Sequence, residues 1–232
     1  MIAIIGDIHG CFNTLKKLVK NIQGKYPGIP LYSVGDLVDR GNFSYEVIEF
    51  VLSEGIKFTP GNHDYMFYYF IHNPSSALGS AWLYNGYEST MDSYKERYEK
   101  IGEHLEIIKS APLYYNLDDC FISHAGISVY LKNRLPENIL DNIEKFEEVI
   151  SDELETEEGI LWTRNKLLDL GKLQVVGHTR KKEVEYNKEN HTVYIDTSVY
   201  AGNKLSAIIV EENRILDTLS IPTDSSDLSL RY

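Results

Sequence analysis

The sequence predicts an α/β fold in which short parallel strands alternate with helices. In the first sixty residues a short apolar run is followed by a polar loop and then by an amphipathic helical pattern, and this order repeats. Hydrophobic residues make up 43% of the chain and charged residues 25%, which is typical of a globular protein. A length of 232 residues suits a single domain with a sizeable core.

The repeating units begin with strands that we expect at residues 2–5, 31–34 and 56–59. Polar loops containing glycine follow at residues 6–10, 35–41 and 61–64. Apolar residues at helical spacing predict a helix after each of the first two loops, with Ser44 as the N-cap of the second helix. Right-handed crossovers bring the carboxyl ends of parallel strands to one edge of a sheet, so we expect the three loops to meet there.

The pattern changes after the third unit. Residues 72–110 are aromatic and polar, and we expect them to form a helical cap over the site, inserted in a single domain of residues 1–232. Strands are expected again at 120–123 and 173–176, and Val184, 193–195 and 205–210 are expected in a second, more antiparallel sheet. The acidic segment 141–158 predicts a solvated helix, and the polar segment 222–232 is a candidate for disorder.

The net charge limits the partners that the protein can have. The chain carries 23 basic and 35 acidic residues, for a formal net charge of -12. A field of that sign repels the phosphate backbone of DNA or long RNA, so we expect no nucleic-acid partner. Small phosphorylated substrates are not excluded, because bound cations can reverse the charge of a site locally.

Cysteine content and hydropathy indicate where the protein works. Cys11 and Cys120 are the two cysteines, and they form no Cys-x-x-Cys pair, which predicts two reduced thiols. No segment approaches the roughly 18 apolar residues of a membrane span, and the N-terminus runs into a strand without a charged leader. We therefore expect a cytoplasmic protein with no membrane partner.

Five polar loops each follow an apolar run, and four of them contain histidine. Each loop alone is a weak signal, because aspartate and asparagine are common turn formers. Together at one sheet edge they would bury carboxylates and imidazoles with too few basic residues to pair them, and buried charges need a partner or a metal. Carboxylate, imidazole and amide donors suit manganese, iron or zinc rather than a closed structural zinc site. The loops hold Asp7 and His9; Asp36, Asp39 and Arg40; Asn62, His63 and Asp64; His124; and His178.

These loops resemble the motifs of a known enzyme family. Residues 6–10 (Gly-Asp-Ile-His-Gly), 35–41 (Gly-Asp-Leu-Val-Asp-Arg-Gly) and 61–64 (Gly-Asn-His-Asp) resemble the three-part signature of the phosphoprotein phosphatases, which belong to the calcineurin-like metallophosphoesterases. Residues 123–126 (Ser-His-Ala-Gly) and 176–179 (Val-Gly-His-Thr) also match. The resemblance covers about residues 1–210 and is closest to the bacterial and bacteriophage serine/threonine phosphatase branch, near the symmetrical diadenosine tetraphosphate hydrolases. It implies a sandwich of two mixed β-sheets flanked by helices, in the order α/β/β/α.

The resemblance also implies a centre of two divalent metal ions, with manganese expected first and iron or zinc as alternatives. Asp7 and His9 resemble ligands of the first metal, and Asp36 resembles the carboxylate that bridges both. The ligands of the second metal correspond to Asn62, His124 and His178. In such a centre a hydroxide that bridges the metals attacks phosphorus in line with the leaving oxygen.

Four further residues resemble the catalytic groups of the family. His63 resembles the general acid that protonates the leaving oxygen, and Asp39 resembles its partner, since a carboxylate fixes the tautomer of an imidazole and raises its pKa. Arg40 resembles a phosphate clamp, and Arg164, in Leu-Trp-Thr-Arg, resembles the second clamp of the bacterial branch.

Some positions depart from the family pattern. Asp64 stands where glutamate is usual, Pro60 where many members have arginine, and Asn42 where proline is common. These changes leave the implied metal ligands and general acid intact, so they bear on substrate identity. Residues 82–94 resemble a segment of the bacterial branch that either shapes the substrate mouth or packs within the cap, and the aromatic run 65–70 either stacks a nucleobase or forms the buried face of a helix.

Three functional hypotheses follow from the sequence. The first is a phosphomonoesterase that acts on phosphoserine or phosphothreonine, in a phosphorylated protein, a peptide or a small substrate. The second is a hydrolase of symmetrical cleavage that acts on dinucleoside polyphosphates such as diadenosine tetraphosphate. The third is a catalytically inactive binding module, which predicts a lost ligand or a lost general acid, and the sequence retains all of them.

Overall fold

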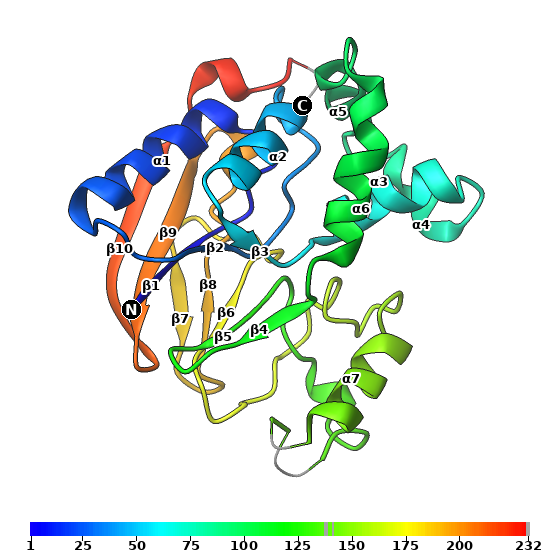
Figure 1. Cartoon of the computed structure of the whole chain (residues 1–232). Helices are drawn as coiled ribbons and strands as arrows, with labels where there is room; N and C mark the ends of the chain where they lie inside the picture. The colour runs from blue at the N-terminus through cyan, green and yellow to red at the C-terminus, as the bar shows by residue number, and fades with distance from the viewer. Residues whose placement is uncertain (137–138, 141, 231–232) are drawn as a thin grey trace.

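The computed structural model describes residues 1–136, 139–140 and 142–230 and shows two five-stranded sheets with helices on their outer faces (Figure 1). The first sheet has the strand order β10-β9-β1-β2-β3, and the second has the order β4-β5-β6-β8-β7. The resemblance implied this α/β/β/α sandwich, and the structure confirms it.

The elements of the first half, up to the end of the insertion, are β1 (Ile2–Ile5), α1 (Phe12–Lys25), β2 (Leu31–Ser33), α2 (Ser44–Ser53), β3 (Lys57–Phe58), α3 (Asn62–His72), α4 (Ala77–Trp82), α5 (Tyr87–Ser93), the 3-10 helix Tyr98–Lys100 and α6 (Ile101–Ser110). Those of the second half are β4 (Tyr114–Asn116), β5 (Phe121–Ser123), the 3-10 helix Val129–Leu131, α7 (Ile143–Asp152), β6 (Gln174–Val176), β7 (Glu185–Asn187), β8 (Thr192–Tyr194), the 3-10 helix Val199–Ala201, β9 (Lys204–Glu211), β10 (Arg214–Pro222) and the 3-10 helix Ser225–Asp227.

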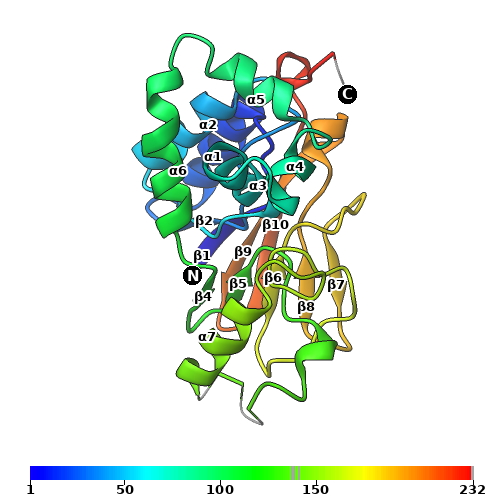
Figure 2. The same cartoon turned by 90° about the vertical axis from the view of Figure 1, so that its right-hand side faces the viewer.

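Alternating side chains along β1 join the layers of the sandwich. Ile2 and Ile4 face the second sheet and share a core with Val175 of β6 and Val193 of β8. Ala3 and Ile5 point to the opposite face and join the core beneath α1 and α2. Because successive residues of a strand point to opposite faces, an unbroken apolar strand is what a central layer requires. Figure 2 shows α7 at the opposite end of the molecule from α1 and α2, where it covers the second sheet.

The predicted parallel order of the first three strands is confirmed, since β1 pairs with β2 and β2 pairs with β3 in parallel. The placement of residues 205–210 in the second sheet is wrong. They form β9, which lies in the first sheet, antiparallel to β1, with Ile208 opposite Ile4. A strand that is buried on both faces reads the same in either sheet, so periodicity could not assign it. The short strand β4 and the edge strand β10 were not predicted.

The C-terminal segment folds back onto the first helix. Both carboxylate oxygens of Asp227 accept hydrogen bonds from the start of α1, at 2.9 Å from the backbone nitrogen of Asn13 and 2.8 Å from that of Thr14. These nitrogens have no partner within the helix, so Asp227 performs the work of an N-cap from a distant part of the chain. The polar segment in which the sequence suggested disorder makes defined contacts as far as Leu228, whose backbone oxygen accepts a hydrogen bond from Asn42 at 2.8 Å, and residues 231–232 lie outside the described residues. Among the residues described, no helix has both the length and the apolar character that crossing a bilayer requires.

Replacing Asp227 with alanine leaves these buried donors without an acceptor. We expect Asp227→Ala to lower the free energy of unfolding by about 2 kcal/mol in urea titrations. The matched control is Asp152→Ala, which removes an exposed carboxylate paired with Arg134 and should cost less than about 1 kcal/mol. Equal losses in the two variants would contradict the capping role.

Candidate metal centre

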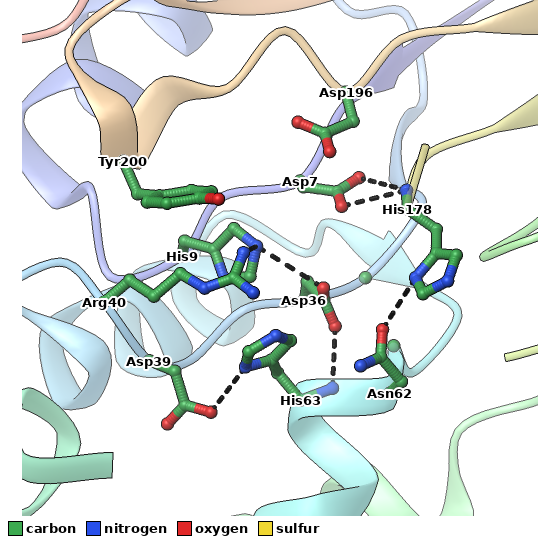
Figure 3. A network of polar contacts seen from close by, with 12 residues as sticks. Asp7, His9, Asp36, Asp39, Arg40, Asn62, His63, His178, Asp196 and Tyr200 are labelled. Atoms are coloured by element: carbon green, nitrogen blue, oxygen red, sulfur yellow. Dashed lines mark hydrogen bonds and ion pairs between the residues drawn. The ribbon is translucent and has the colours of Figure 1, made fainter. Parts of the chain in front are cut away.

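Loops from both sheets meet at one edge of the sandwich. The first sheet contributes the loops after β1, β2 and β3, and the second contributes those after β5, β6 and β8 (Figure 3). They enclose a cavity of about 110 Å³. Eight of the residues singled out from the sequence line it, namely Asp7, His9, Asp36, Arg40, Asn62, His63, Arg164 and His178, while Asp39 and His124 lie buried directly behind.

The backbone of these loops is unusual. Five of the site residues have positive φ angles, from 45° at His9 and 49° at Asp36 to 58° at His178, 71° at Asp39 and 72° at Arg40. Residues other than glycine seldom adopt this left-handed conformation, and such strain persists where the surroundings impose it, often at functional sites. The sharp turns let one short loop present several side chains to the same cavity.

Glycines leave room for two of the carboxylates. A Cβ atom at Gly61 would collide with the carboxylate of Asp36, and one at Gly177 would collide with that of Asp7. Both glycines therefore permit the close approach of carboxylates from other loops. Asp64 holds the same loops together, since its carboxylate accepts the backbone N–H of Gly61 at 2.8 Å and that of Leu37 at 2.9 Å. The shorter residue at this position thus connects the second loop to the third.

Lone pairs converge around Asn62. His124 Nδ1 faces the carbonyl oxygen of Val34 at 2.8 Å, so Nδ1 donates and Nε2 carries the lone pair. His178 Nε2 likewise donates to the carbonyl oxygen of Trp162 at 2.9 Å, which leaves Nδ1 unprotonated. These two free nitrogens lie 3.0 and 2.8 Å from Asn62 Oδ1, which also only accepts. Three acceptors this close, with no hydrogen between them, repel one another unless a cation lies among them.

A second set of acceptors adjoins the first. His9 Nδ1 donates to the carbonyl oxygen of Val38 at 3.0 Å, so its Nε2 is an acceptor on the cavity side, 3.4 Å from Asp36 Oδ2, and it accepts a hydrogen bond from Arg40 Nη1 at 3.0 Å. The other oxygen of Asp36 lies 3.6 Å from His124 Nε2. Two groups of ligand atoms lie within 4.8 Å of one another, His9–Asp36–His63 and Asp7–Asp36–His124, and Asp36 belongs to both. One carboxylate therefore stands between two potential cation positions.

The protonation of the site follows from burial. Burial lowers the pKa of His9 and of His178 well below the usual histidine value and lowers the pKa of His124 to about 4, so these rings are neutral and able to ligate. Burial, together with repulsion from Asp196 and Asp36, raises the pKa of Asp7 well above its usual value. Burial also raises the pKa of Asp36, to about 7. The site thus combines carboxyl groups whose ionisation is disfavoured with neutral imidazoles whose lone pairs point inward. This set of ligand atoms fits divalent cations.

His63 and Asp39 form a separate pair at the rim of this set. His63 Nδ1 lies 2.7 Å from Asp39 Oδ2, and the His63 backbone N–H donates to Asp36 at 2.9 Å. Burial lowers the pKa of His63 well below the usual histidine value and raises the pKa of Asp39 well above the usual aspartate value, so the pair favours sharing one proton. Asp39 accepts further hydrogen bonds from Trp82 Nε1 at 2.9 Å and Thr90 Oγ1 at 2.7 Å, which act against burial and favour its anionic form. The pair therefore has an arrangement in which a proton can be held at His63.

The insertion of residues 72–110 provides these two donors. The sequence left open whether its Trp82 and Thr90 motif shapes the substrate mouth or packs, and the structure places both side chains in the interior behind Asp39. The residues that line the 110 Å³ cavity all come from outside the insertion, which thus supports the site from behind. The run 65–70 is helical, and Tyr65, Met66 and Phe67 are buried, as the packing alternative predicted.

Three cavity residues escaped the sequence analysis. Asp196 is buried next to Asp7, and its pKa is raised by burial. Tyr200 lies beneath the Arg40 guanidinium, 4.2 Å from it, and its hydroxyl accepts a hydrogen bond from Arg180 at 2.7 Å. Asp196 carried a usable signal, because it follows an apolar strand in the same way as the five recognised loops. Tyr200 and Arg180 carried none, since their roles depend on the path of the chain after β6 and β8.

The family of the chain is identified by its similarity to a known family model. A family model described as "Calcineurin-like phosphoesterase" matches residues 1–210. The chain belongs to this family. Calcineurin-like phosphoesterases typically bind two divalent metal ions, and membership makes the protein a metal-dependent hydrolase of phosphoric esters.

Curated relatives of the chain include other members of the family. A "Bis(5'-nucleosyl)-tetraphosphatase PrpE [asymmetrical]" of Anoxybacillus flavithermus is 29% identical over 242 residues, which cover 95% of this chain and 93% of the relative. A protein of the same name from a Geobacillus species is also 29% identical, with 96% and 94% covered. The likeness thus extends over nearly the whole of each chain.

Solved structures with the same fold include two phosphatases. A cold-active protein-tyrosine phosphatase of a psychrophilic Shewanella species has a TM-score of 0.64 at 20% identity, with 96% of this chain and 80% of that chain covered. A serine/threonine phosphatase of Saccharomyces cerevisiae has a TM-score of 0.56 at 16% identity, with 99% and 81% covered. At these identities the likeness shows that the two proteins share the fold of this chain.

The converging acceptors predict that metal binding stabilises the protein through Asp36. At pH 8, Mn²⁺ at one hundred times its Kd should raise the Tm of the wild type by roughly 5–10 °C. Asp36→Asn removes the shared negative charge, so its metal-free Tm should equal or exceed that of the wild type, and Mn²⁺ should raise it by less than half as much.

Differential scanning calorimetry with and without Mn²⁺ provides the measurement. The control is Asp169→Asn, a substitution at an exposed aspartate, which should keep the full shift. An unchanged shift in Asp36→Asn would contradict the bridging position of this carboxylate.

Proposed function

We propose that this protein hydrolyses dinucleoside polyphosphates at a centre of two divalent cations, with manganese as the expected metal. Asp7, His9 and Asp36 would hold one cation, and Asp36, Asn62, His124 and His178 would hold the other. When bound, the cations would acidify a water molecule and offset the negative charge of the phosphate oxygens. The curated relatives, which match nearly the whole chain, carry the name of such a hydrolase and thereby support this substrate class.

One structural observation carries the proposal. Arg164 lines three cavities: the metal cavity, a cavity of about 370 Å³ that contains Trp162, and a cavity of about 700 Å³ that contains Arg180, and the last two share no other lining residue. A substrate held at the metals can therefore extend in two directions from the phosphorus atom under attack. This suits a molecule with a nucleoside on both sides of a phosphate chain.

The side chains around the metal cavity have distinct tasks in this reaction. Arg40 and Arg164 would bind oxygens of the phosphate under attack, since the guanidinium group donates hydrogen bonds in a fixed fork. Arg40 is held for this task by its stacking on Tyr200. His63, oriented by Asp39, would give its proton to the leaving oxygen, and Trp82 keeps Asp39 in place.

The second candidate is hydrolysis of phosphoserine or phosphothreonine. The motif resemblance favours it, and so does the position of the insertion, because no residue of 72–110 is among those that line the metal cavity, which leaves room for an extended peptide. A catalytically inactive binding module is disfavoured, because every residue implied as a ligand or acid is present and lies at the centre.

Comparison of two substrates tests the proposal. Purified protein with Mn²⁺ should hydrolyse diadenosine tetraphosphate with a kcat/KM at least tenfold above that for a phosphoserine peptide, and excess EDTA should abolish both activities. A tenfold preference for the phosphopeptide would instead establish the second candidate. Undiminished turnover after complete metal removal, verified by elemental analysis, would reject the two-metal centre itself.

The acid role of His63 predicts a dependence on the leaving group. His63→Asn should reduce kcat roughly 10²–10⁴-fold for leaving groups of high pKa and much less for p-nitrophenol, which leaves without a proton. Calorimetric titration should show unchanged Mn²⁺ stoichiometry. His72→Asn, a substitution of an exposed histidine on the same helix, is the control and should retain full activity. Equal losses with both kinds of leaving group would count against proton donation.

A further inference from the structure

The chain places its one run of three consecutive basic residues beside the metal centre. Arg180, Lys181 and Lys182 follow His178 and Thr179 directly, in a protein with a net charge of -12. Acidic residues outnumber basic ones by 35 to 23, so a cluster of cations in this place needs an explanation.

These residues form the wall of the 700 Å³ cavity. It shares Arg164, His178 and Arg180 with the metal cavity, so the two adjoin. Glu183 is the one acidic residue on its lining, and its carboxylate is paired with Lys204. The lining therefore has a strong excess of positive charge.

Most of this charge is available to a ligand. In the part of the chain that the structure describes, Lys181 pairs with Glu185 at 2.6 Å, whereas Arg164, Arg180 and Lys182 have no carboxylate within ion-pair distance. Arg180 instead donates to the hydroxyl of Tyr200, which holds its guanidinium at the boundary between the two cavities. Cations that are left unpaired next to one another repel, and an anion relieves that repulsion.

The cavity of about 370 Å³, which also contains Arg164, has a different character. It contains Trp162 and Leu78 but also the acidic residues Glu155 and Glu157, with Arg164 as its one basic residue. Such a site disfavours additional phosphates and offers an aromatic and aliphatic surface instead. The two directions that lead away from the metals are therefore electrostatically unequal.

We propose that the Arg180–Lys182 cavity is a subsite for the phosphate chain beyond the bond that is cut, and that in this chain it produces the cleavage at one end that the relatives' name, "asymmetrical", describes. This inference rests on the proposed function and names the part of the substrate that this subsite holds. One nucleoside with a single phosphate lies on the Trp162 side, and the remaining phosphates extend past Arg180 to Lys182. Charge-assisted hydrogen bonds from arginine and lysine suit such a chain.

The position of the phosphate chain in the subsite determines the products. The oxygen of one water molecule bonds to the phosphorus nearest the Trp162 side, and the bridging P–O bond to the next phosphate breaks. The proton on His63 goes to the leaving oxygen, and a proton of the water is released to solvent. A dinucleoside tetraphosphate thus gives one nucleoside monophosphate and one nucleoside triphosphate, rather than two diphosphates.

Charge reversal at the far end of the subsite provides the test. Lys182→Glu should raise the KM for diadenosine tetraphosphate at least tenfold with Mn²⁺ and change kcat/KM for p-nitrophenyl phosphate less than twofold, because a monoester does not reach Lys182. Lys188→Glu, an identical change at an exposed lysine beyond the other end of β7, should alter neither. Lys182→Ala should show a smaller effect in the same direction.

Three outcomes would overturn the subsite: no change in KM for the dinucleotide, an equal loss on both substrates, or adenosine diphosphate as the main product of the wild type in chromatography. Weaker binding of an acidic phosphopeptide alone would assign the cavity to a protein substrate, which also rejects the proposal.

Failure of the proposed function can be separated from failure of the subsite. If the wild type cleaves p-nitrophenyl phosphate but no dinucleotide, the proposed function is wrong. The subsite alone is then tested by measuring how tripolyphosphate, with Mn²⁺ in excess, inhibits the cleavage of p-nitrophenyl phosphate. Lys182→Glu should raise the inhibition constant at least fivefold. An unchanged constant would reject the subsite.

Discussion

The structure of the site depends on one constraint: acceptor atoms from separate loops point at one another with no hydrogen between them. His124 and His178 direct lone pairs at Asn62 Oδ1, and the carboxylate of Asp36 lies between this group and His9. Each ring is fixed in its tautomer by a backbone carbonyl, so moving a proton does not relieve the conflict. A cation among these acceptors relieves it with the Asn62 oxygen facing inward, and the left-handed turns and the close glycine contacts are the means by which the chain maintains the arrangement.

The sandwich separates the tasks of the site among its layers. Parallel strands of the first sheet deliver Asp7, Asp36 and Asn62, and parallel strands of the second deliver His124 and His178, so the facing of the two sheets creates the centre. The helical insertion holds the His63–Asp39 pair from behind through Trp82 and Thr90. The proposed metal ligands and the proposed proton donor are thus supported by different parts of the fold.

Much of this was accessible from the sequence, and the reason is physical. An apolar strand that ends in a glycine-containing polar loop fixes both its own direction and the place of its side chains, so ten residues could be brought to one edge without coordinates. The assignment of a strand to a sheet failed for β9. This strand is buried on both faces, so its sequence pattern fits either sheet. It also failed for Tyr200 and Arg180, whose contacts join loops far apart along the chain. Asp196 directly follows an apolar strand and lines the cavity, so the same rule of strand followed by polar loop could have found it.

The central claim is that the shared acceptors of Asp36 hold two cations. Anomalous diffraction at the manganese edge, from crystals grown with Mn²⁺, tests it most directly. The account predicts two peaks, one beside Asp7 and His9 and one beside Asn62, His124 and His178, with Asp36 between them. A single peak, or none at saturating Mn²⁺, would contradict the account and would require another explanation for the facing lone pairs.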